Sequence, residues 1–341
     1  MRILINTVCF YPNIGGLETI NMILAKELSR IGQDVTVLAP DYPSMEYDDS
    51  RLPFRIIRGA SRSILLKEYM RCDVFLHSPL SLKAIWPIVL WPFKKWFCVY
   101  HMCEFHTGTT KNVQARLKYL VSRFPKNIAV SNAVKEHLKL PNCTVIHNAY
   151  DNTLFKDDNK NNRKGFSFVG RLVSVKGIFI LLDAFTEFVK RNPMSIHNVL
   201  HIIGDGEERS RIVDYIQKEG LEENVVLHGM LTGKELVDEM NGCYCQVVPS
   251  VYNEAFGIVA LEAMATGCIP LVSDGDGLQE AVGDSVYTFK KSDSNHLLTR
   301  MEYFANLTTD EVHNIRKSMK AWCSHFTPEV VANNYLNCFT S

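Results

Sequence analysis

Short apolar strands alternate with amphipathic helices along most of the 341-residue chain, and this alternation constrains the fold more than any other feature. The chain opens with a strand-like segment at 2–8, a helical segment at 16–32 and a second strand-like segment at 34–40. Strands that alternate with helices form parallel sheets with right-handed crossovers. The sequence therefore predicts an α/β protein built on doubly wound parallel sheets.

The alternation occurs twice, and a polar segment separates the two runs. Further strand-like segments lie at 54–59, 73–77, 96–101, 127–131 and 143–148 in the first run, and at 166–171, 198–204, 224–229, 245–250 and 269–273 in the second. Segment 156–165 between them has almost nothing to bury, as is typical of a linker. A length of 341 residues suits two domains. We expect domains at 1–155 and 156–325 and a C-terminal helix at 326–341 that packs back toward the first domain.

Charge, cysteine content and the first residues indicate the cellular compartment and bear on a nucleic-acid partner. Lys plus Arg and Asp plus Glu both number 37, so no net charge draws the chain toward nucleic acid. Ten cysteines without a CxxC pair indicate reduced thiols in a reducing compartment. The first residues form a strand pattern and lack the charged head and long apolar core of a signal peptide. We therefore expect a cytoplasmic protein without a nucleic-acid partner.

Two segments of the first run bear on membrane contact. The apolar segment 84–93 holds two prolines and is too short to span a bilayer. We expect it to form a buried helix and loop, and a surface that dips into a membrane is the alternative, because tryptophans lie beside Lys94 and Lys95. Segment 111–124 predicts a basic amphipathic helix, which either packs on the rest of the protein or lies on an anionic membrane.

The carboxyl ends of the strands carry the most informative residues, because ligands of open α/β sheets bind there. Gly15 and Gly16 follow the first strand and permit close backbone approach where a helix begins. Arg171 and Lys176 follow the first strand of the second run, on a turn that is flanked by glycines. Two cations in such a turn suit a diphosphate. No GxGxxG pattern is present, which disfavours a nicotinamide dinucleotide.

Glu254 and Glu262 flank an almost wholly apolar run in YNEAFGIVALEAMA (252–265). Carboxylates are costly to desolvate, so the pair either marks the solvated ends of a helix or faces a ligand rich in hydroxyl groups. Gly257 lets the backbone come close, and the free N–H groups at 256–258 make a site for an anion or a hydroxyl. Phosphate suits the cations and amides, and hydroxyls suit the carboxylates. A nucleotide sugar offers both groups.

With these motifs, the sequence resembles the retaining family 4 glycosyltransferases. Their GT-B architecture has two Rossmann-like doubly wound parallel-sheet domains that face each other across a cleft. The resemblance covers nearly the whole chain. It rests on GGLE with Glu18, SNAVKEHL (131–138), IHNAYDNTLF (146–155), GRLVSVKG (170–177), GDGEERSRI (204–212) and PSVYNEAFGIVALEAMATGCIPLVSD (249–274). The E-x7-E pattern, with PS before it and FG inside it, is the most specific part.

The resemblance implies roles for individual residues. The residues that bind the donor diphosphate would be Gly15, Gly16, Arg171 and Lys176. The residues that hold the donor sugar would be His101, Glu254, Ala255, Phe256, Gly257 and Ile258. Glu262 would hold the ribose, and backbone near Met230 and Leu231 would contact the base. The catalytic residues would be His101, Glu254, Arg171 and Lys176, with the role of His101, chemical or positional, left open.

The resemblance also implies an activity. A hexose or N-acetylhexosamine would pass from a nucleotide sugar, a UDP sugar rather than a GDP sugar being favoured, to a hydroxyl of a lipid-linked saccharide or glycolipid. The product would enter a surface polysaccharide such as lipopolysaccharide or capsule. The first domain would bind the acceptor and the second the donor, at the inner face of the plasma membrane. The alternatives are a nucleotide-sugar 2-epimerase on the same fold and a binding subunit without catalysis.

Two clusters contain residue types that bind metals, so a metal site has to be considered as an alternative. His101, Cys103, Glu104 and His106 lie close in sequence, but residues 101 and 103 would point to opposite faces of a strand. Asp274 and Asp276 resemble the DxD metal motif of other transferases, but the surrounding fold is wrong for that motif. Cys243 and Cys245 are expected to pack or to stay free. We therefore expect neither a metal nor another cofactor, while the role of the loop at 274–277 stays open.

Overall fold

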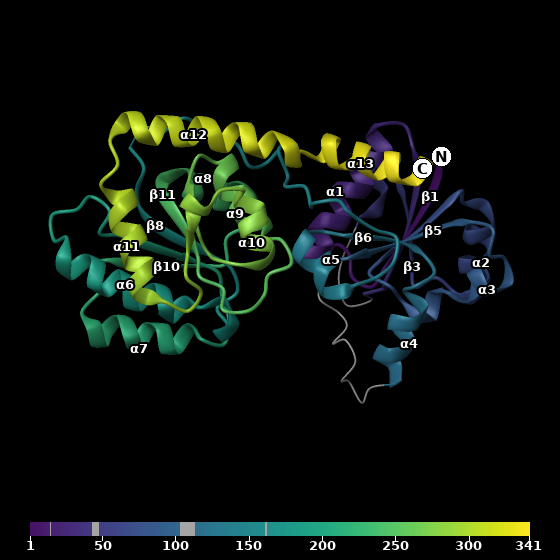
Figure 1. Cartoon of the computed structure of the whole chain (residues 1–341), viewed down its shortest axis with the longest axis horizontal. Helices are drawn as coiled ribbons and strands as arrows, with labels where there is room; N and C mark the ends of the chain where they lie inside the picture. Colours follow the sequence, from purple (N-terminus) through teal and green to yellow (C-terminus); the bar gives the residue numbers. More distant parts are fainter. Residues whose placement is uncertain (14, 43–47, 103–112, 161) are drawn as a thin grey trace. The chain divides into compact units, whose positions relative to one another are not determined.

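The structure is a computed structural model that describes residues 1–13, 15–42, 48–102, 113–160 and 162–341. The chain forms two compact units (Figure 1). Unit 1 comprises Met1–Tyr150 and Phe326–Ser341, and unit 2 comprises Asp151–His325. Each unit holds one parallel sheet, which confirms the α/β class with two Rossmann-like domains.

Unit 1 contains a seven-stranded sheet in the order β3-β2-β1-β4-β5-β6-β7. Its strands are β1 (Arg2–Thr7), β2 (Asp34–Ala39), β3 (Arg55–Arg58), β4 (Val74–Ser78), β5 (Lys95–Tyr100), β6 (Lys126–Ala129) and β7 (Cys143–Val145). All pairings are parallel, and Ile3 of β1 lies opposite Val35 on one side and Val74 on the other. All five residues of β4 are buried, because helices cover both faces of a parallel sheet.

The helices of unit 1 come from both ends of the chain. They are α1 (Gly16–Arg30), α2 (Arg62–Arg71), α3 (Trp86–Leu90), α4 (Val113–Val121), α5 (Asn132–Leu138) and α13 (Pro328–Thr340), with the 3₁₀ turns η1 (Asp49–Arg51) and η2 (Leu82–Ala84). The last helix, α13, packs against α1. Lys95 Nζ donates to the Phe339 carbonyl oxygen at 2.7 Å, and the Phe97 and Phe339 rings lie 4.8 Å apart. The chain's last residues therefore belong to the core of unit 1.

Unit 2 contains a six-stranded parallel sheet in the order β10-β9-β8-β11-β12-β13. Its strands are β8 (Lys164–Val169), β9 (Leu200–Ile203), β10 (Val225–Gly229), β11 (Cys243–Val248), β12 (Ile269–Ser273) and β13 (Thr288–Phe289). Its helices are α6 (Ile178–Arg191), α7 (Arg209–Glu219), α8 (Gly233–Gly242), α9 (Ile258–Ala265), α10 (Asp276–Val282), α11 (Ser294–Ala305) and α12 (Thr309–Cys323). Three 3₁₀ turns complete it: η3 (Ser174–Lys176), η4 (Ser285–Tyr287) and η5 (Ser324–Phe326), the last at the change of unit.

The polar segment 156–165 belongs to unit 2 rather than standing between the units. Its last two residues already form β8. Arg163 is buried, and its guanidinium pairs with Asp157 at 2.5 Å and donates to the side-chain oxygen of Asn241 at 3.1 Å. The change of unit falls at 150/151 and again at 325/326.

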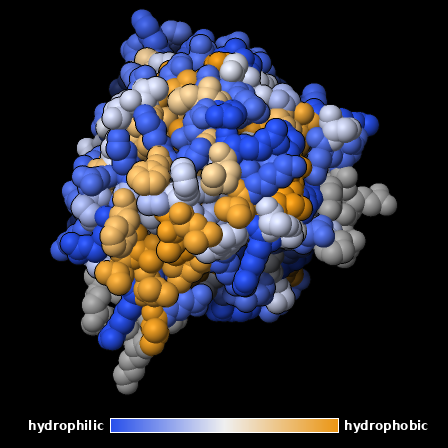
Figure 2. Space-filling model, turned by 90° about the vertical axis from the view of Figure 1, so that its right-hand side faces the viewer, coloured by the Kyte–Doolittle hydropathy of each residue, from blue (hydrophilic) through white to orange (hydrophobic). Residues whose placement is uncertain are grey.

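Residues 84–88 of the apolar segment 84–93 are buried or partly buried, but residues 89–93 are exposed, so the expectation of a buried helix and loop is wrong for its second half. Val89 is 78% exposed and Phe93 is 81% exposed. Helix α4 buries none of its residues, although it carries apolar side chains such as Leu117 and Leu120. Figure 2 shows apolar side chains gathered in a patch on unit 1. No helix in the described part of the chain is long and apolar enough to cross a bilayer.

Candidate active site

Each sheet reverses its strand order once, and the predicted site residues follow the strands at these points. The order reverses between β1 and β4 in unit 1 and between β8 and β11 in unit 2. Doubly wound sheets bind ligands at this reversal, outside the carboxyl ends of the strands. Gly15 follows β1, Arg171 and Lys176 follow β8, and Glu254 follows β11. Each unit therefore has one candidate site of its own.

Lys176 and Glu254 form a short ion pair in unit 2. Lys176 Nζ lies 2.6 Å from Glu254 Oε1. Tyr252 joins the pair, because its hydroxyl accepts from Lys176 Nζ at 3.0 Å and donates to Glu254 Oε2 at 2.6 Å. Ser250 Oγ donates to Glu254 Oε1 at 2.7 Å. The sequence assigns Lys176 and Glu254 to different parts of a donor, and the structure places them in one cluster.

Two loops meet to bring this cluster together. The Val251 amide donates to the Val175 carbonyl oxygen at 3.0 Å. Gly177 has a φ of 70°, and a Cβ at this position would lie 1.9 Å from the Pro249 carbonyl oxygen. Since neither the backbone conformation nor the space allows a side chain, Gly177 is required for the close approach of the two loops.

The environment of the ion pair favours its charged form. Burial would raise the pKa of Glu254, but the charge of Lys176 and the hydrogen bonds from Lys176, Tyr252 and Ser250 lower it overall. Burial would lower the pKa of Lys176, but the charge of Glu254 and the hydrogen bonds with Glu254 and Tyr252 raise it overall. Both groups are therefore ionised at neutral pH.

Both members of the pair retain capacity for a ligand. An ammonium group has three N–H donors, and Lys176 directs two of them at Glu254 and Tyr252. Each carboxylate oxygen accepts about two hydrogen bonds. Glu254 Oε1 already accepts from Lys176 and Ser250, whereas Oε2 accepts only from Tyr252 among the side chains described. One N–H for a phosphate and one lone pair for a hydroxyl thus remain side by side.

Arg171 supplies a second cation at the same strand end. Its side chain is exposed and makes no ion pair within the described residues. The loop at 204–209 packs on the turn that carries it: a Cβ on Gly204 would lie 1.9 Å from the Gly170 carbonyl oxygen, and one on Gly206 would lie 2.4 Å from that of Leu172. The glycines of GDGEER therefore serve loop packing in unit 2.

The start of α9 offers backbone N–H groups. Gly257 caps the helix at a φ of 93° without a side-chain cap, so the first-turn amides point out of the helix end. Ala255 and Ile258 are partly exposed, whereas the Phe256 side chain is buried at 2% exposure and packs in the unit 2 core. Gly277 packs closely on this stretch, since a Cβ there would lie 2.5 Å from the Phe256 nitrogen, so Gly257 and Ile258, both partly exposed, are the positions most open to a ligand.

The loop at 274–277 supports the Glu254 loop rather than forming a pair of free carboxylates. The Gly277 amide donates to the Glu254 carbonyl oxygen at 3.1 Å. Asp276 pairs with Lys291 at 3.0 Å, and Asp274 Oδ1 accepts from the Lys291 amide at 2.8 Å. The other metal candidate has three of its four residues, Cys103, Glu104 and His106, outside the described residues.

Glu262 lies on α9, half-buried and close to a second carboxylate. Burial and the charge of Asp151 together raise the pKa of Glu262 to about 7. A carboxylate in such a place gains from hydroxyl donors, because each donated hydrogen bond stabilises its charged form. Met230, 64% exposed, and Leu231 follow the carboxyl end of β10.

In unit 1, Glu18 occupies the space beside Gly15. Helix α1 begins at Gly16, and Gly15 caps it without a side-chain hydrogen bond. A Cβ on Gly15 would lie 2.5 Å from Glu18 Oε2, so the carboxylate folds back over the helix start. A diphosphate at this loop would have to displace the Glu18 carboxylate, because two anions cannot share the site.

His101, which follows β5, ends a chain of hydrogen bonds between side chains. Asn21 Nδ2 donates to Thr7 Oγ1 at 3.0 Å, and Ser78 Oγ donates to Asn21 Oδ1 at 2.7 Å. Ser78 Oγ has its own hydrogen committed to Asn21, so it accepts from His101 Nε2, 2.8 Å away. This assigns the proton of His101 to Nε2 and leaves Nδ1 as an acceptor.

The neutral form of His101 follows from its burial. Burial lowers the pKa of His101 to about 3, so the imidazole is uncharged at neutral pH and is a weak base. Nδ1 is buried and has no hydrogen-bond partner in the described part of the chain. The arrangement suits a fixed acceptor for a hydroxyl better than a group that takes up a proton.

Five residues of these sites were not predicted from the sequence: Ser250, Tyr252, Thr7, Asn21 and Ser78. Ser250 and Tyr252 precede Glu254 at alternate positions within the quoted motif, so their spacing offered a signal. Thr7, Asn21 and Ser78 offered none, because they lie on β1, α1 and β4 and come together only in the folded unit.

Comparison with known proteins identifies two family matches. Residues 150–322 match the family described as "Glycosyl transferases group 1". Residues 14–154 match the family described as "Glycosyltransferase Family 4". The first match alone spans more than half of the 341 residues and contains every site residue of unit 2.

Similar proteins cover different shares of the chain. A phosphatidylinositol N-acetylglucosaminyltransferase component of Arabidopsis thaliana is 22% identical over 359 residues, which cover 94% of this chain and 79% of that protein. An uncharacterized glycosyltransferase of Methanocaldococcus jannaschii is 38% identical over 128 residues, which cover 37% of this chain and only 31% of that protein.

Solved structures share the fold over the whole chain. Anabaena HepE, solved in complex with UDP and glucose, aligns with a TM-score of 0.76 at 18% identity and covers 100% of this chain and 99% of its own. A glycosyltransferase from Rickettsia africae aligns with a TM-score of 0.80 at 17% identity and covers 99% and 98%. The two Rossmann-like sheets thus match the GT-B architecture of these proteins.

Proposed function

Because the chain belongs to the group 1 glycosyltransferases, we propose that it transfers a hexose or N-acetylhexosamine, with retention of configuration, from a nucleotide sugar to a hydroxyl of a lipid-linked saccharide or glycolipid. The observation that carries this proposal is the cluster of Lys176, Tyr252 and Glu254 beside Arg171, at the strand-order reversal of unit 2. It combines cations for a diphosphate with a carboxylate for sugar hydroxyls.

The donor would lie along unit 2. Its diphosphate would meet Arg171 and the third N–H of Lys176, its sugar would meet Glu254 Oε2 and the amides at the start of α9, and its ribose would meet Glu262. A UDP sugar is favoured over a GDP sugar, and HepE, which shares the fold, was solved with UDP. The base would contact the backbone after β10, near Met230 and Leu231.

The chemistry would depend on charge stabilisation. When the bond between the sugar and the diphosphate breaks, negative charge develops on the leaving phosphate oxygen. Arg171 and Lys176 would stabilise that charge without a metal ion. The freed phosphate oxygen would accept the proton of the acceptor hydroxyl, which attacks from the same face. Uncharged His101, with a pKa of about 3, would orient the donor sugar rather than act as the base.

A surface of unit 1 supports a membrane-bound acceptor. A pocket of about 580 Å³ is lined by apolar residues such as Val89, Trp96 and Phe124, with Lys94 and Lys126 at its sides. Phe124 is 76% exposed. Exposed apolar side chains beside lysines suit an anionic lipid surface. We infer that this surface contacts the inner face of the plasma membrane, where a lipid-linked acceptor of surface polysaccharide synthesis is available.

An assay of nucleotide release separates the transferase from its alternatives. The protein is incubated with a panel of UDP and GDP sugars, with and without a lipid-linked saccharide, and the glycosidic product is examined by NMR. A retaining transferase releases nucleotide only when the acceptor is present and keeps the anomeric configuration of the donor. Conversion or hydrolysis of the donor without acceptor would favour the 2-epimerase, and binding without turnover would favour a binding subunit.

Liposome flotation tests the membrane contact. We expect the protein to float with anionic vesicles at low salt and the variant with both Phe93→Ser and Phe124→Ser to remain in solution. Met194→Ser is the matched control, because Met194 is an apolar residue of unit 2 that is 93% exposed. Failure of the unmodified protein to float at low salt would overturn the membrane contact.

A further inference from the structure

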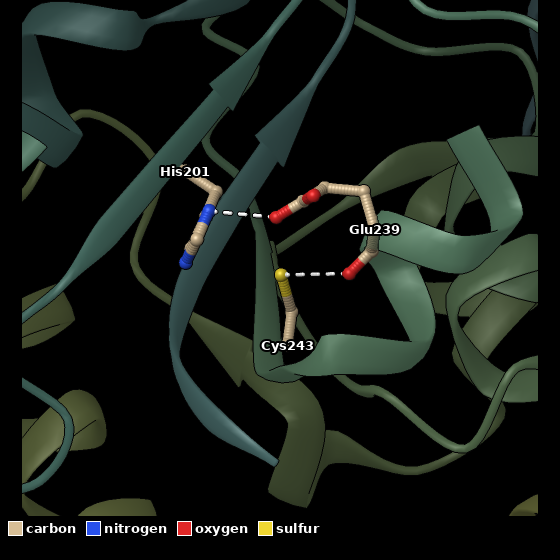
Figure 3. A group of neighbouring side chains, drawn as sticks. All are labelled: His201, Glu239 and Cys243. Carbon is tan, nitrogen blue, oxygen red and sulfur yellow. Dashed lines mark hydrogen bonds and ion pairs between the residues drawn. The ribbon is translucent and has the colours of Figure 1, made fainter. Parts of the chain in front are cut away.

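Two histidines, a glutamate and a cysteine converge in unit 2, outside the candidate active site. His201 lies on β9, His228 on β10, Glu239 in the last turn of α8, and Cys243 at the first position of β11. Figure 3 shows the side chain of His201 directed at the Glu239 carboxylate and that of Cys243 directed at the Glu239 carbonyl oxygen. The ligand atoms of these three residues all lie within 4.8 Å of one another.

Three possible ligand atoms of the cluster lie closer together still. His201 Nδ1 is 2.8 Å from Glu239 Oε1 and 3.0 Å from His228 Nε2. His228 Nε2 is 3.5 Å from the same carboxylate oxygen. All three side chains are largely buried, with 21%, 19% and 27% of their surface exposed. Water therefore solvates these three side chains only in part.

Hydrogen bonds within the cluster cannot satisfy all three of these atoms at once. A neutral imidazole nitrogen carries either one hydrogen or one lone pair. If His201 Nδ1 carries the hydrogen, that hydrogen cannot lie on the line to Glu239 and on the line to His228 at once. If Nδ1 carries a lone pair, it can accept from His228 Nε2 at 3.0 Å, but it then faces the carboxylate oxygen at 2.8 Å with no hydrogen between them. A cation between the three atoms would satisfy all of them.

The separations match those of ligands around one metal ion. Zinc binds histidine nitrogen and carboxylate oxygen at about 2.0–2.2 Å in tetrahedral geometry, which places neighbouring ligand atoms about 3.4 Å apart. The observed separations of 2.8, 3.0 and 3.5 Å need only small side-chain adjustments to reach this value. Cys243 Sγ lies within 4.8 Å of the ligand atoms of His201 and Glu239. It donates to the Glu239 carbonyl oxygen at 3.3 Å, so it would have to turn toward the other three atoms to fill a fourth position.

We propose that His201, His228, Glu239 and Cys243 bind a zinc ion that stabilises unit 2. Imidazole, carboxylate and thiolate form a set that suits zinc, and four protein ligands leave no open position for catalysis. The site joins β10, the edge strand of the sheet, to β9, α8 and β11. Binding converts the Cys243 thiol to a thiolate, and the displaced proton passes to solvent.

Metal content and cobalt spectra test the proposal without reliance on activity. The purified protein is stripped with a chelator, dialysed against zinc and analysed by mass spectrometry for bound metal. We expect about one zinc per chain and a rise in unfolding temperature on zinc addition. Cobalt, added instead of zinc, should give the intense visible bands of a tetrahedral site and a thiolate charge-transfer band.

Matched variants locate the metal. Glu239→Gln keeps the shape of the side chain, and we expect it to weaken zinc binding by more than about tenfold, the lower end of the loss seen for residues that only orient ligands. Cys243→Ala should remove the thiolate band, whereas Cys245→Ala, which removes an equally buried cysteine from the same strand, should keep it. Circular dichroism of each variant shows whether it is folded. A folded protein that binds no zinc, or zinc binding equal in Glu239→Gln, would overturn the proposal.

Discussion

The candidate sites of the two units differ in charge. In unit 2, Lys176 and Glu254 are both ionised and hold each other at 2.6 Å. In unit 1, His101 is uncharged and its orientation is fixed by Ser78 at 2.8 Å. Both sites lie where a parallel sheet reverses its strand order.

Under the proposed function, this difference would separate two tasks that a glycosyl donor requires. A leaving diphosphate needs charge, and the ion pair keeps a lysine positioned while leaving it one free N–H. A reacting sugar needs orientation, and a neutral acceptor on a fixed ring supplies that without competing for the acceptor's proton. We therefore expect variants in unit 2 to affect charge stabilisation and variants in unit 1 to affect positioning.

Lys176→Ala is expected to have the largest effect. It removes a cation from the leaving diphosphate and leaves Glu254 largely buried without its counter-charge, so transfer should fall by more than about 100-fold, as for loss of a preorganised charge stabiliser. Lys190→Ala, which removes an exposed lysine at the far end of α6, is the matched control. Transfer rates measured at saturating donor give the comparison, and equal rates in the two variants would remove Lys176 from the site.

Glu254→Gln should separate turnover from diphosphate binding. The amide keeps the shape of the carboxylate but presents an N–H₂ group where a sugar hydroxyl and Tyr252 both donate, so turnover should fall by about 10- to 100-fold. Lys176 remains charged, and UDP affinity measured by calorimetry should change little. If UDP affinity collapsed together with turnover, Glu254 would belong to the diphosphate site instead.

These two predictions depend on contacts that could not be predicted from the sequence. Apolar periodicity predicts nearly every strand, and strand ends predict where ligands bind. The pairing of Lys176 with Glu254 depends on the contact of two loops through Val251 and Val175, which are far apart in sequence. Segment 156–165 has the polar composition of a linker. That composition gives no sign that Arg163 is buried, because its burial depends on its pairing with Asp157. The exposure of residues 89–93 could not be predicted, because apolar residues are expected to be buried, as residues 84–88 of the same segment largely are.

Glu262 should make donor affinity depend on pH. Its pKa of about 7 in the free protein lies above the usual value, and hydrogen bonds from a ribose diol would lower it, so the ionised form binds. Affinity for a UDP sugar should rise about tenfold between pH 6 and pH 8, because the ionised fraction of such a group rises by that factor. Calorimetry at both values checks the slope, which Glu262→Gln should abolish.

The same raised pKa predicts an effect on stability. Since the folded protein holds the Glu262 proton more tightly than the unfolded chain, the free energy of unfolding carries a penalty that is absent below the unfolded pKa and fully present above pH 7. Glu262→Gln should therefore unfold at a higher temperature than the unmodified protein at pH 8, although it binds donor less well. A pH-independent affinity in the unmodified protein would contradict the assignment to the ribose.

Ser78→Ala should have the smallest effect and should act in unit 1. It removes the acceptor of His101 Nε2, so the ring loses its fixed orientation and kcat should fall by several-fold, about the cost of one neutral hydrogen bond. UDP affinity should stay the same, and Ser78→Thr should restore part of kcat. Ser81→Ala is the control, because it removes a nearby hydroxyl outside the chain of hydrogen bonds. A loss confined to KM would contradict a positioning role.

Calorimetric titration of UDP in EDTA tests the central claim, that Lys176 and Arg171 hold the donor diphosphate without a metal. We expect the unmodified protein to bind UDP equally well in EDTA and in manganese, and Lys176→Ala to bind it at least about tenfold more weakly, the equivalent of one charged hydrogen bond. Zinc at the His201 cluster would not alter this result, because Glu239→Gln should bind UDP as the unmodified protein does. UDP binding that requires manganese, survives Lys176→Ala and is lost in Asp274→Asn would contradict the claim and assign the diphosphate to the loop at 274–277.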